Sequence, residues 1–562
     1  MKPFDSVSEK ASHDMTGTPL EFFFSFCIGK GNGTLTPFVS LNHSITHSLT
    51  HSLTHSQLPL TLIRLRHRSF SVTDPLLLSR RSVSSPLRLQ HRSVSVAISA
   101  SVVVSAAAMK MKNICLLVFF LILSSSVLFL SSLFSYSSNS DKIDHLPQQP
   151  EVKFNQYSGY ITVDEIQKRF LFYYFVEAEV QPSLKPVVMW LHGGPGCSSV
   201  GLGAFQEHGP FQPTDQGLAK NNYSWNKEAN MLYLDSPAGA GFSYSANKSF
   251  YNLVTDETTA RDNLVFLQQW FTKFSHYKNN EFFITGESYT GHFAPQLAAL
   301  ILQTKTNINL KGIAIGNPLL EFNTDYNSRG QFLWSHGLIT YSTYELVTKV
   351  CNYSRITREY RSGTVNSSCV EVIDRLNREV GDFIDDFDVS QDMCRPLGQH
   401  IWTLPHGEKK RAFCLEDKIF NYLNKKGVQK ALHTRISSWQ TCGAIWYDSK
   451  SIENSTISLL GTLVKSGVRV MVFSGDQDSV IPFFSTQSLL DGLAKDLGLY
   501  VGPYRPWYNG IKVAGFTQVY GDILTFATVR GAGHSCAYSK PEETFLLFKT
   551  FLEGWYLPKI KL

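Results

Sequence analysis

The residues with the clearest chemical meaning surround Ser288, in the segment GESYTG at 286–291. The apolar run at 281–285 predicts a buried strand before it, and the spacing of Ala, Leu and Ile at 292–303 predicts a helix after it. A Gly-x-Ser-x-Gly turn between a strand and a helix is typical of a nucleophile elbow, in which a strained turn lifts the serine hydroxyl clear of a sheet. Since a glycine-rich turn can also hold an ordinary serine, the function depends on partners elsewhere in the chain.

A serine hydroxyl becomes a good nucleophile only when an oriented base takes its proton. After a nucleophile elbow of this kind, an acid and then a histidine follow the serine, each just past a later strand. Asp476 and Asp478 follow the apolar run at 469–473, and His534 follows the run at 524–529. This order predicts a catalytic triad, although either aspartate could instead cap a turn and His534 could serve the geometry of its glycine loop.

The elements expected to position these residues are strands and helices that alternate along the chain. The runs at 157–163 and 169–176 predict an antiparallel opening pair. The other expected elements are strands at 187–191, 231–234 and 310–315 and amphipathic helices at 255–274 and 542–555. Such alternation with short connections predicts an α/β protein in which a mostly parallel central sheet has helices on both faces. The nucleophile elbow makes this the α/β-hydrolase fold.

The alternation of predicted strands and helices stops between about 321 and 450, where helical and polar segments replace the apolar runs typical of strands. We interpret this part as a helical cap inserted over the C-terminal edge of the sheet. The predicted division is a core in two parts, at 141–321 and 451–562, separated by a cap insertion at 322–450.

The charge of the chain is concentrated near its beginning. Of the 562 residues, 43% are hydrophobic and 17% charged, an ordinary globular composition that allows a large core. Residues 1–108 hold ten Lys or Arg against five Asp or Glu, and Lys110 and Lys112 follow, so residues 113–562 sum to −1 within a total of +6. A nearly neutral body gives no electrostatic reason to expect nucleic-acid binding.

Residues 1–108 are predicted to be a low-complexity leader that is not part of the mature protein. A repeat in this leader places histidines at every fourth position, at His43, His47, His51 and His55. On a helix they could form a metal-binding stripe, but Ser and Thr dominate the repeat, which favours low complexity. Residues 57–108 are rich in Arg and Ser, a composition typical of transit peptides, and a gene prediction extended upstream is the simpler alternative.

The segment at 109–140 has the charged start and the apolar stretch of a secretory signal, so translation is expected to start at Met109 or Met111. Its apolar span at 114–134 is long for a signal peptide and just long enough to cross a bilayer. The serines in this span and in 135–140 favour a cleaved signal peptide over a retained signal anchor.

The cysteines and glycosylation sequons predict the secretory route. Nine cysteines are present and no two form a Cys-x-x-Cys pair, which argues against zinc or thioredoxin-like chemistry. Six of the cysteines lie between 197 and 442, compatible with three disulfides in an oxidising compartment. Five sequons follow the signal-like segment, at Asn222, Asn247, Asn352, Asn366 and Asn454. An extracellular and a vacuolar destination both remain open.

The chain from about residue 150 to its C-terminus resembles the serine carboxypeptidases, the plant-type secretory or vacuolar peptidases of the α/β-hydrolase fold. The motifs that carry this resemblance are WLHGGPGCSS (190–199), NYSWNKEANMLYLDSPAGAGFSYS (222–245), GESYTGHFAPQLA (286–298), IAIGNP (313–318), SGDQDSVIP (474–482) and VRGAGH (529–534). The resemblance implies that Ser288 is the nucleophile, His534 the general base and acid, and Asp478 the carboxylate that orients the histidine. The backbone N–H groups of Gly194 and Tyr289 would form the oxyanion hole.

An exopeptidase also needs a receptor for the free carboxylate of its substrate. The resemblance assigns this role to Glu287 and to a second glutamate, matched here by Glu207, together with His192 and Gly193 of the first motif. Two carboxylates in contact share a proton, so one apparent pKa rises and the protonated pair can donate to a substrate carboxylate. Carboxypeptidase activity at acidic pH is therefore expected, whereas a solvated turn residue is the alternative role for Glu287.

The resemblance also implies three disulfides, which are Cys197–Cys442, Cys351–Cys369 and Cys394–Cys414. The first would tie the oxyanion loop to the cap, and the other two would staple the cap itself. Cys536 would be left unpaired beside the catalytic histidine, either as a reactive thiol or as a buried inert one.

Two positions depart from the family's usual pattern. His192 stands where the family has an asparagine that helps to bind the terminal carboxylate, so it either donates similarly or alters the preference. Ser535, Cys536 and Ala537 follow His534, where the family has an apolar or acidic residue and then Val-Pro. The second departure puts the preference for the leaving residue in doubt more than the activity.

The expected function is a serine-type carboxypeptidase that releases C-terminal residues from peptides at acidic pH through an acyl-enzyme on Ser288. An acyltransferase of the same family, using glucose esters, is one alternative, but such relatives tend to carry Asp in the elbow where this chain has Glu287. A non-catalytic binding or scaffold protein is another, against which the intact triad argues. An ordinary esterase or lipase fits the elbow but not Glu207 and the other motifs.

No metal or organic cofactor is implied. The expected partners are peptides with a free C-terminus, a membrane only if 114–134 is retained, and in one open alternative a second copy of the chain.

Overall fold

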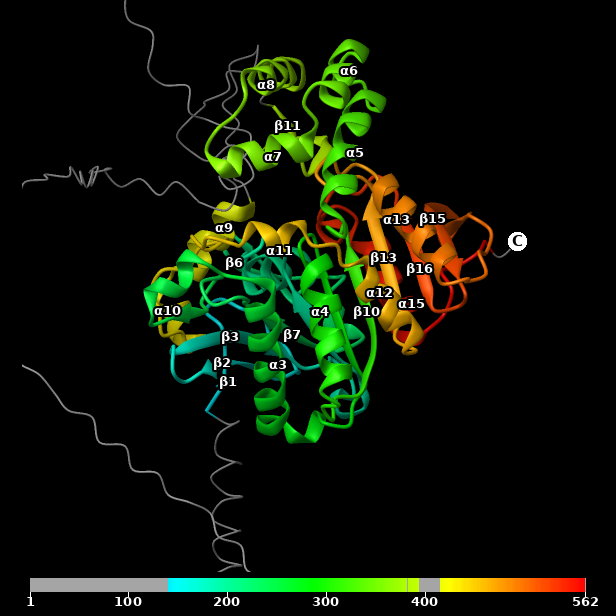
Figure 1. Ribbon diagram of the computed structural model, residues 1–562. Coiled ribbons are helices and arrows are strands. Elements are labelled where there is room, and N and C mark those ends of the chain that lie inside the picture. Colours follow the sequence, from blue (N-terminus) through cyan, green and yellow to red (C-terminus); the bar gives the residue numbers. More distant parts are fainter. Residues whose placement is uncertain (1–139, 382, 394–414, 561–562) are drawn as a thin grey trace, which may run out of the picture. The chain divides into compact units, whose positions relative to one another are not determined.

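The computed structural model describes residues 140–381, 383–393 and 415–560 (Figure 1). The predicted leader at 1–108 and the apolar span at 114–134 lie outside these residues. Within the described ranges, every helix is too short or too polar to cross a bilayer.

A sheet of 12 strands forms the core of the described chain. Its strand order is β1-β2-β3-β7-β4-β9-β10-β13-β16-β15-β14, and β8 pairs with β3. All neighbours from β7 to β16 in this order are parallel, whereas the strands at both edges are antiparallel. The mostly parallel sheet and the α/β class predicted from the sequence are confirmed. The strands are β1 (Lys142–Ile143), β2 (Gln156–Asp164), β3 (Arg169–Val176), β4 (Val187–Leu191), β7 (Asn230–Leu234), β8 (Tyr244–Ser245), β9 (Phe282–Glu287), β10 (Leu310–Gly316), β13 (Arg469–Gly475), β14 (Arg505–Asn509), β15 (Lys512–Tyr520) and β16 (Leu524–Val529).

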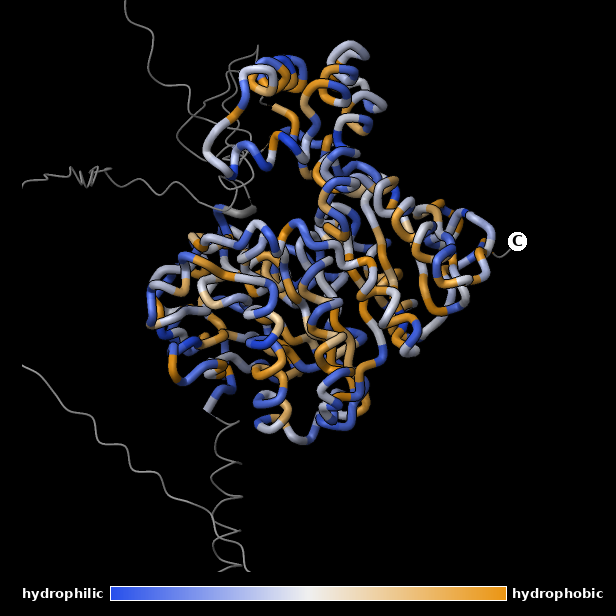
Figure 2. Tube along the Cα trace, viewed as in Figure 1, coloured by the Kyte–Doolittle hydropathy of each residue, from blue (hydrophilic) through white to orange (hydrophobic). Residues whose placement is uncertain are grey.

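Helices cover both faces of this sheet because its central strands are apolar on both sides. In β4, Val187, Met189 and Leu191 belong to one apolar cluster, and Val188 and Trp190 belong to the other, as the two-residue period of a strand requires. Figure 1 shows α3 and α4 side by side on one face, and Figure 2 shows the apolar residues gathered along the strands and the helices that cover them. The helices of the first cluster are α3 (Asp256–Lys273), α4 (Thr290–Gln303), α12 (Ile457–Lys465) and α13 (Phe483–Asp496), and those of the second are α9 (Leu415–Leu423), α10 (Lys426–Ala431), α14 (Cys536–Ser539) and α15 (Pro541–Glu553).

The segment that follows β10 forms a cap with an apolar cluster of its own. Four helices supply this cluster, and they are α5 (Phe322–Ser335), α6 (Tyr341–Lys349), α7 (Tyr353–Ser362) and α8 (Ser367–Val380). Helix α5 also contacts α13 and the short helix α11 (Ser449–Glu453), so it connects the cap to the core. The helical character expected for this region agrees with the structure, apart from the small hairpin of β11 (Ile384–Asp385) and β12 (Asp388–Asp392).

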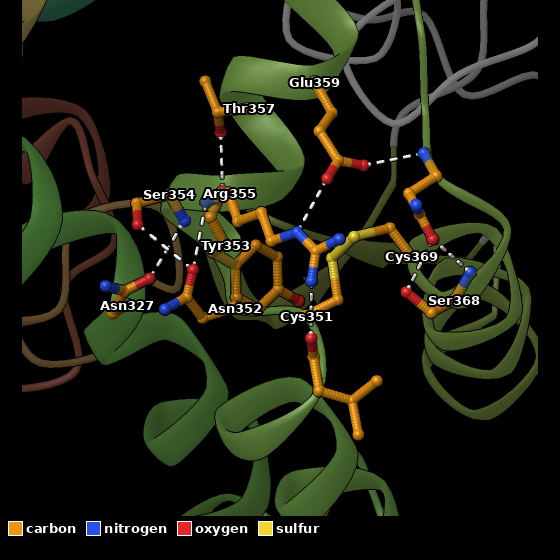
Figure 3. The surroundings of a disulfide bond; sticks show 12 residues. Asn327, Cys351, Asn352, Tyr353, Ser354, Arg355, Thr357, Glu359, Ser368 and Cys369 are labelled. Carbon is orange, nitrogen blue, oxygen red and sulfur yellow. Dashed lines mark hydrogen bonds and ion pairs between the residues drawn. A yellow bond between two sulfur atoms is a disulfide. The ribbon is translucent and has the colours of Figure 1, made fainter.

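A disulfide between Cys351 and Cys369 joins the beginnings of α7 and α8 (Figure 3). Beside it, Glu359 accepts a hydrogen bond from Arg355 Nε (2.7 Å) and another from the backbone N–H of Asn366 (2.8 Å). These contacts tie the two helices together. The expected Cys394–Cys414 pair lies outside the described residues.

Three features went unpredicted because their local pattern is weak. The antiparallel strands β14 and β15 extend the sheet beyond β16, although their sequence lacks a clean alternation of polar and apolar residues. A second hairpin consists of β5 (Phe211–Thr214) and β6 (Gly217–Lys220). Residues Ser199–Glu207 form a π-helix after the first glycine-rich motif, and this helix ends at one of the two glutamates that the carboxylate receptor requires.

Candidate active site

Ser288 occupies a strained turn between β9 and α4, with a backbone φ of +61°. The glycines on either side are required by space. A Cβ on Gly286 would lie 2.0 Å from the carbonyl oxygen of Leu191, and one on Gly291 would lie 2.2 Å from that of Leu319. The Ser288 N–H donates to the carbonyl of Gly316 on the neighbouring strand (2.9 Å), which fixes the turn against the sheet. A left-handed serine held in this way has the geometry of a nucleophile elbow.

The acid and the histidine lie at the same edge of the sheet, because β9, β10, β13 and β16 are parallel neighbours. Asp478 Oδ2 lies 2.7 Å from His534 Nδ1. Asp478 also accepts hydrogen bonds from the side chain of Asn317 (2.8 Å) and from the backbone N–H groups of Val480 (2.8 Å) and Ile481 (3.3 Å). The fully buried carboxylate therefore accepts hydrogen bonds from several donors, and because it engages Nδ1 it leaves Nε2 of the imidazole as the nitrogen that can take a proton.

Asp476, the other candidate acid, has a different role. Its Oδ1 accepts a hydrogen bond from the N–H of Gly531 (2.7 Å), in the loop that leads to His534. The structure thus separates the two aspartates of the GDQD segment. Asp478 orients the histidine, and Asp476 holds the loop on which the histidine stands.

Electrostatics at His534 are consistent with a base. Burial opposes the charged imidazolium, but the Asp478 carboxylate and its hydrogen bond, with a smaller contribution from Glu287, outweigh burial and raise the pKa of His534. A raised pKa means a stronger attraction for the serine proton in the transition state, at the cost of a smaller neutral fraction at acidic pH.

The expected oxyanion hole faces the elbow. A Cβ on Gly193 would lie 2.5 Å from the backbone nitrogen of Tyr289 and 2.6 Å from Ser288 Cβ, so only a glycine lets the two loops approach this closely. Gly194 follows with a φ of +112°. Among the described residues, the N–H groups of Gly194 and Tyr289 have no protein acceptor, and both residues line one pocket with Ser288. Two free donors beside the nucleophile suit a developing oxyanion.

Two links to distant segments hold this loop and Tyr289 in place. The disulfide Cys197–Cys442 joins the glycine-rich loop to the segment before α11. The hydroxyl of Tyr289 donates to Asp256 Oδ1 (3.0 Å), and His292 Nδ1 lies 2.9 Å from Asp256 Oδ2. Asp256 lies in the first turn of α3, and no local sequence pattern indicated its contact with the oxyanion residue, which became visible only in the structure.

The predicted carboxylate receptor is a buried cluster of His192, Glu207 and Glu287. His192 Nδ1 lies 3.8 Å from Glu207 Oε1, and His192 Nε2 lies 3.6 Å from Glu287 Oε1. Burial, reinforced by repulsion from His534, lowers the pKa of His192 to about 3, so the ring is neutral and these contacts are not ion pairs. His192 Nδ1 has no hydrogen-bond partner among the described residues, and the two carboxyl oxygens of Glu207 have none there apart from the facing carboxyl group of Glu287.

The raised pKa values of both glutamates favour a proton shared between them. Burial and then the charge of Glu287 raise the pKa of Glu207 well above its ordinary value. Burial raises the pKa of Glu287 to about 7, although His534 and a hydrogen bond from Ser535 Oγ (2.7 Å) oppose the rise. Because Glu207 has no other partner, a hydrogen bond between the carboxyl groups requires a proton, and the protonated pair can donate to an incoming anion.

The same three residues have the composition of a metal site, since one donor atom from each lies within 4.8 Å of the others. The raised pKa values of both glutamates favour protons there at acidic pH, and a metal ligand must be deprotonated. The arrangement therefore suits a receptor for a carboxylate better than a cation site.

Besides Asp256, sequence reasoning missed two further residues of the site. Asn317, with a φ of +41°, donates to Asp478 and accepts from the N–H of Gly475 (3.1 Å). Its signal was its position directly after β10, at the edge where the triad forms. Ser535 had been noted only as a departure, yet it joins the loop of the histidine to the receptor.

Cys536, the unpaired cysteine of the described chain, is buried, and its Sγ lies 3.3 Å from Asn317 Oδ1. Burial, together with nearby carboxylates, raises the pKa of its thiol well above the ordinary value. A thiol that resists ionisation is a poor nucleophile, so Cys536 contributes packing beside the triad.

Comparisons with known proteins show the family to which the chain belongs. The sequence profile of the family described as serine carboxypeptidase matches residues 147–554. Serine carboxypeptidase-like 45 and serine carboxypeptidase-like 46 of Arabidopsis thaliana are 53% and 52% identical over 76% and 75% of this chain, covering 95% and 94% of those proteins. The crystal structure of Kex1(delta)p, a prohormone-processing carboxypeptidase from Saccharomyces cerevisiae, shares the fold, with a TM-score of 0.59 at 21% identity over 74% of this chain and 95% of that one. The chain belongs to the serine carboxypeptidase family.

Proposed function

We propose that this protein is a serine-type carboxypeptidase that removes the last residue of peptides at acidic pH. The observation that carries the proposal is the buried pair of Glu207 and Glu287, placed next to the turn of Ser288 and contacted by a neutral His192. A protonated pair of this kind has no evident use in a general esterase. It suits an enzyme that must recognise the free carboxylate at the end of its substrate.

The positions of the residues support the following reaction. Ser288 Oγ would attack the last peptide carbonyl while His534 takes its proton at Nε2, because Nδ1 is engaged by Asp478. The negative carbonyl oxygen would accept hydrogen bonds from the Gly194 and Tyr289 N–H groups. His534 then returns the proton to the leaving nitrogen, the C–N bond breaks, and the shortened peptide remains as an ester of Ser288. A water molecule, deprotonated by His534, releases it by the same route.

The compartment follows from a separate observation. We infer that the protein enters the secretory route, because the disulfides Cys197–Cys442 and Cys351–Cys369 both form in the structure and such bonds persist in oxidising compartments. Extracellular space and vacuole both satisfy this condition.

The decisive test is release of the last residue from an N-blocked dipeptide at pH 5. Replacing Ser288 by alanine is expected to lower kcat/KM by at least about 10⁴-fold, as for the loss of a nucleophile in a triad. Amidation of the substrate's C-terminus is expected to lower it by roughly 10- to 100-fold, because a hydrogen bond to a charged group is lost. Equal rates for acid and amide would refute the receptor. If the folded protein cleaves no peptide but transfers an acyl group from a glucose ester to an alcohol, the proposed function changes from carboxypeptidase to acyltransferase.

A further inference from the structure

Ser288 lines a pocket, and none of the residues proposed to bind the terminal carboxylate of the substrate lines it. The residues that line it are Gly194, Pro195, Ser288, Tyr289, Leu319, Tyr326, Thr357, Arg361, Ile452, Val480 and Ile481. A bound substrate would place its terminal carboxylate at Glu207 and Glu287 and its last peptide carbonyl at Ser288. The side chain of the penultimate residue, which forms the acyl group, is then left to enter this pocket.

Most of the pocket wall is apolar, and one cationic side chain, from the cap, contributes to it. Thr357 and Arg361 are four residues apart on α7, so they share the face of the helix that is turned toward Ser288. Among the residues lining the pocket, Arg361 alone is a cation at ordinary pH, and Ile452 and Val480 are among the apolar residues that line the pocket with it.

Arg361 differs from the other arginines of the same helix. Arg355 binds Glu359 at 2.7 Å, and Arg358 binds Glu453 at 2.9 Å. In contrast, the guanidinium of Arg361 donates to Ser449 Oγ (3.2 Å), and no carboxylate of the described residues lies within 4.0 Å of it. A partly buried guanidinium that has a neutral partner only is available to an anionic ligand.

We propose that Arg361 makes this enzyme selective for substrates with an acidic side chain, Glu or Asp, at the penultimate residue. The inference rests on the proposed acyl transfer at Ser288. The carboxylate of such a residue would pair with the Arg361 guanidinium, while its methylene groups lie against the apolar wall. The pair forms on the acyl side of the scissile bond, so it is independent of the receptor for the terminal carboxylate.

The test compares N-benzyloxycarbonyl dipeptides that share leucine as the leaving residue and differ only in Glu, Gln or Lys before it. At pH 5.5 a glutamate side chain is ionised, because its ordinary pKa is about 4.3. We expect kcat/KM to be about tenfold higher for Glu than for Gln, as one charge-assisted bidentate pair provides. Arg361→Gln should bring this ratio to about one, and Arg361→Glu should favour Lys over Gln.

Arg358→Gln is the matched control, because Arg358 lies on the same helix but outside the pocket, and it should keep the tenfold preference. The p-nitrophenyl esters of the same blocked residues separate this inference from the proposed function. These esters carry no terminal carboxylate, so their acylation of Ser288 should show the same Glu-to-Gln ratio even if no dipeptide is cleaved. A wild-type ratio near one with the esters, or a preference that survives in Arg361→Gln, would overturn the inference.

Discussion

Glu287 connects three parts of the site through one side chain. It faces Glu207, it lies 3.6 Å from His192 Nε2, and its Oε1 accepts a hydrogen bond from Ser535, the residue next to the catalytic histidine. The charge of His534 therefore affects the pKa of Glu287, and the proposed proton of the glutamate pair and the proton that His534 would transfer can influence each other. Their effects on the pH profile must be separated before either is assigned.

The ratio of the kcat/KM values for two substrates separates these effects. The pKa of Glu287 is raised to about 7 and the pKa of Glu207 is raised well above its ordinary value, so the pair loses its first proton near pH 7. The two substrates are a blocked dipeptide with a free C-terminal carboxylate and the p-nitrophenyl ester of the same blocked residue. The ratio of kcat/KM for the dipeptide to kcat/KM for the ester should therefore fall about tenfold between pH 5 and pH 8, as the loss of one proton with this pKa predicts. The ionisation of His534 affects both substrates alike and cancels in the ratio.

Glu287→Gln provides the control for this measurement, because an amide cannot lose a proton in this range. The variant should bind the acid more weakly at pH 5, and its ratio should change little between pH 5 and pH 8. A wild-type ratio that stays constant across this range would contradict the shared proton.

At the scale of the elements, the elbow depends on how closely β9 approaches its neighbours. A Cβ on Gly286 would lie 2.0 Å from a backbone oxygen of β4, an atom that cannot move without distorting the sheet. Gly286→Ala is therefore expected to destabilise the fold by about 3 kcal/mol, the upper range for overpacking. Gly492→Ala is the matched control, because Gly492 stands within α13 with nothing within 4 Å of an added Cβ.

The control should gain about 0.5 to 1 kcal/mol, because alanine has the higher helix propensity and a less flexible unfolded chain. Thermal melts of both variants at one scan rate distinguish the cases. If the Gly286→Ala variant is as stable as the wild type, the elbow can accommodate a Cβ atom at this position, contrary to the close approach of the two strands in the structure.

At the scale of the whole molecule, the five sequons can be examined for access. Asn222, Asn247, Asn366 and Asn454 are exposed, and Asn352 is half-buried at the start of α7, where its Oδ1 accepts a hydrogen bond from Arg355 N (3.0 Å). The amide nitrogen of each side chain is the atom that carries a glycan. Glycosylation therefore remains a prediction that the positions allow.

Mass spectrometry of the protein from its native tissue tests the secretory route. Treatment with an N-glycosidase should lower the mass and convert occupied asparagines to aspartates, and the first residue should lie after the segment at 109–140. An unglycosylated protein whose peptides include residues 1–108 would contradict both the route and the predicted start of translation.

How much could be predicted from the sequence depended on whether a feature is local. The strand, turn and helix around Ser288 have a pattern within a few residues, and the position of His534 past a strand is equally local. The resemblance to a family added Glu207, which no local pattern indicates. The roles of Asn317 and Asp256, by contrast, arise from contacts between segments far apart in the chain, as in the hydrogen bond from Asn317 to Asp478 across 161 residues.

The cap's separate apolar cluster has a consequence for how this family can diversify. The triad stands on the sheet, whereas Tyr326, Thr357 and Arg361 reach the same pocket from helices packed around their own cluster and the Cys351–Cys369 disulfide. Mutations on the inner face of α7 can thus alter which substrates are chosen while the chemistry stays intact. Selection can act on the two properties almost independently, and laboratory evolution of new specificities should begin with α7.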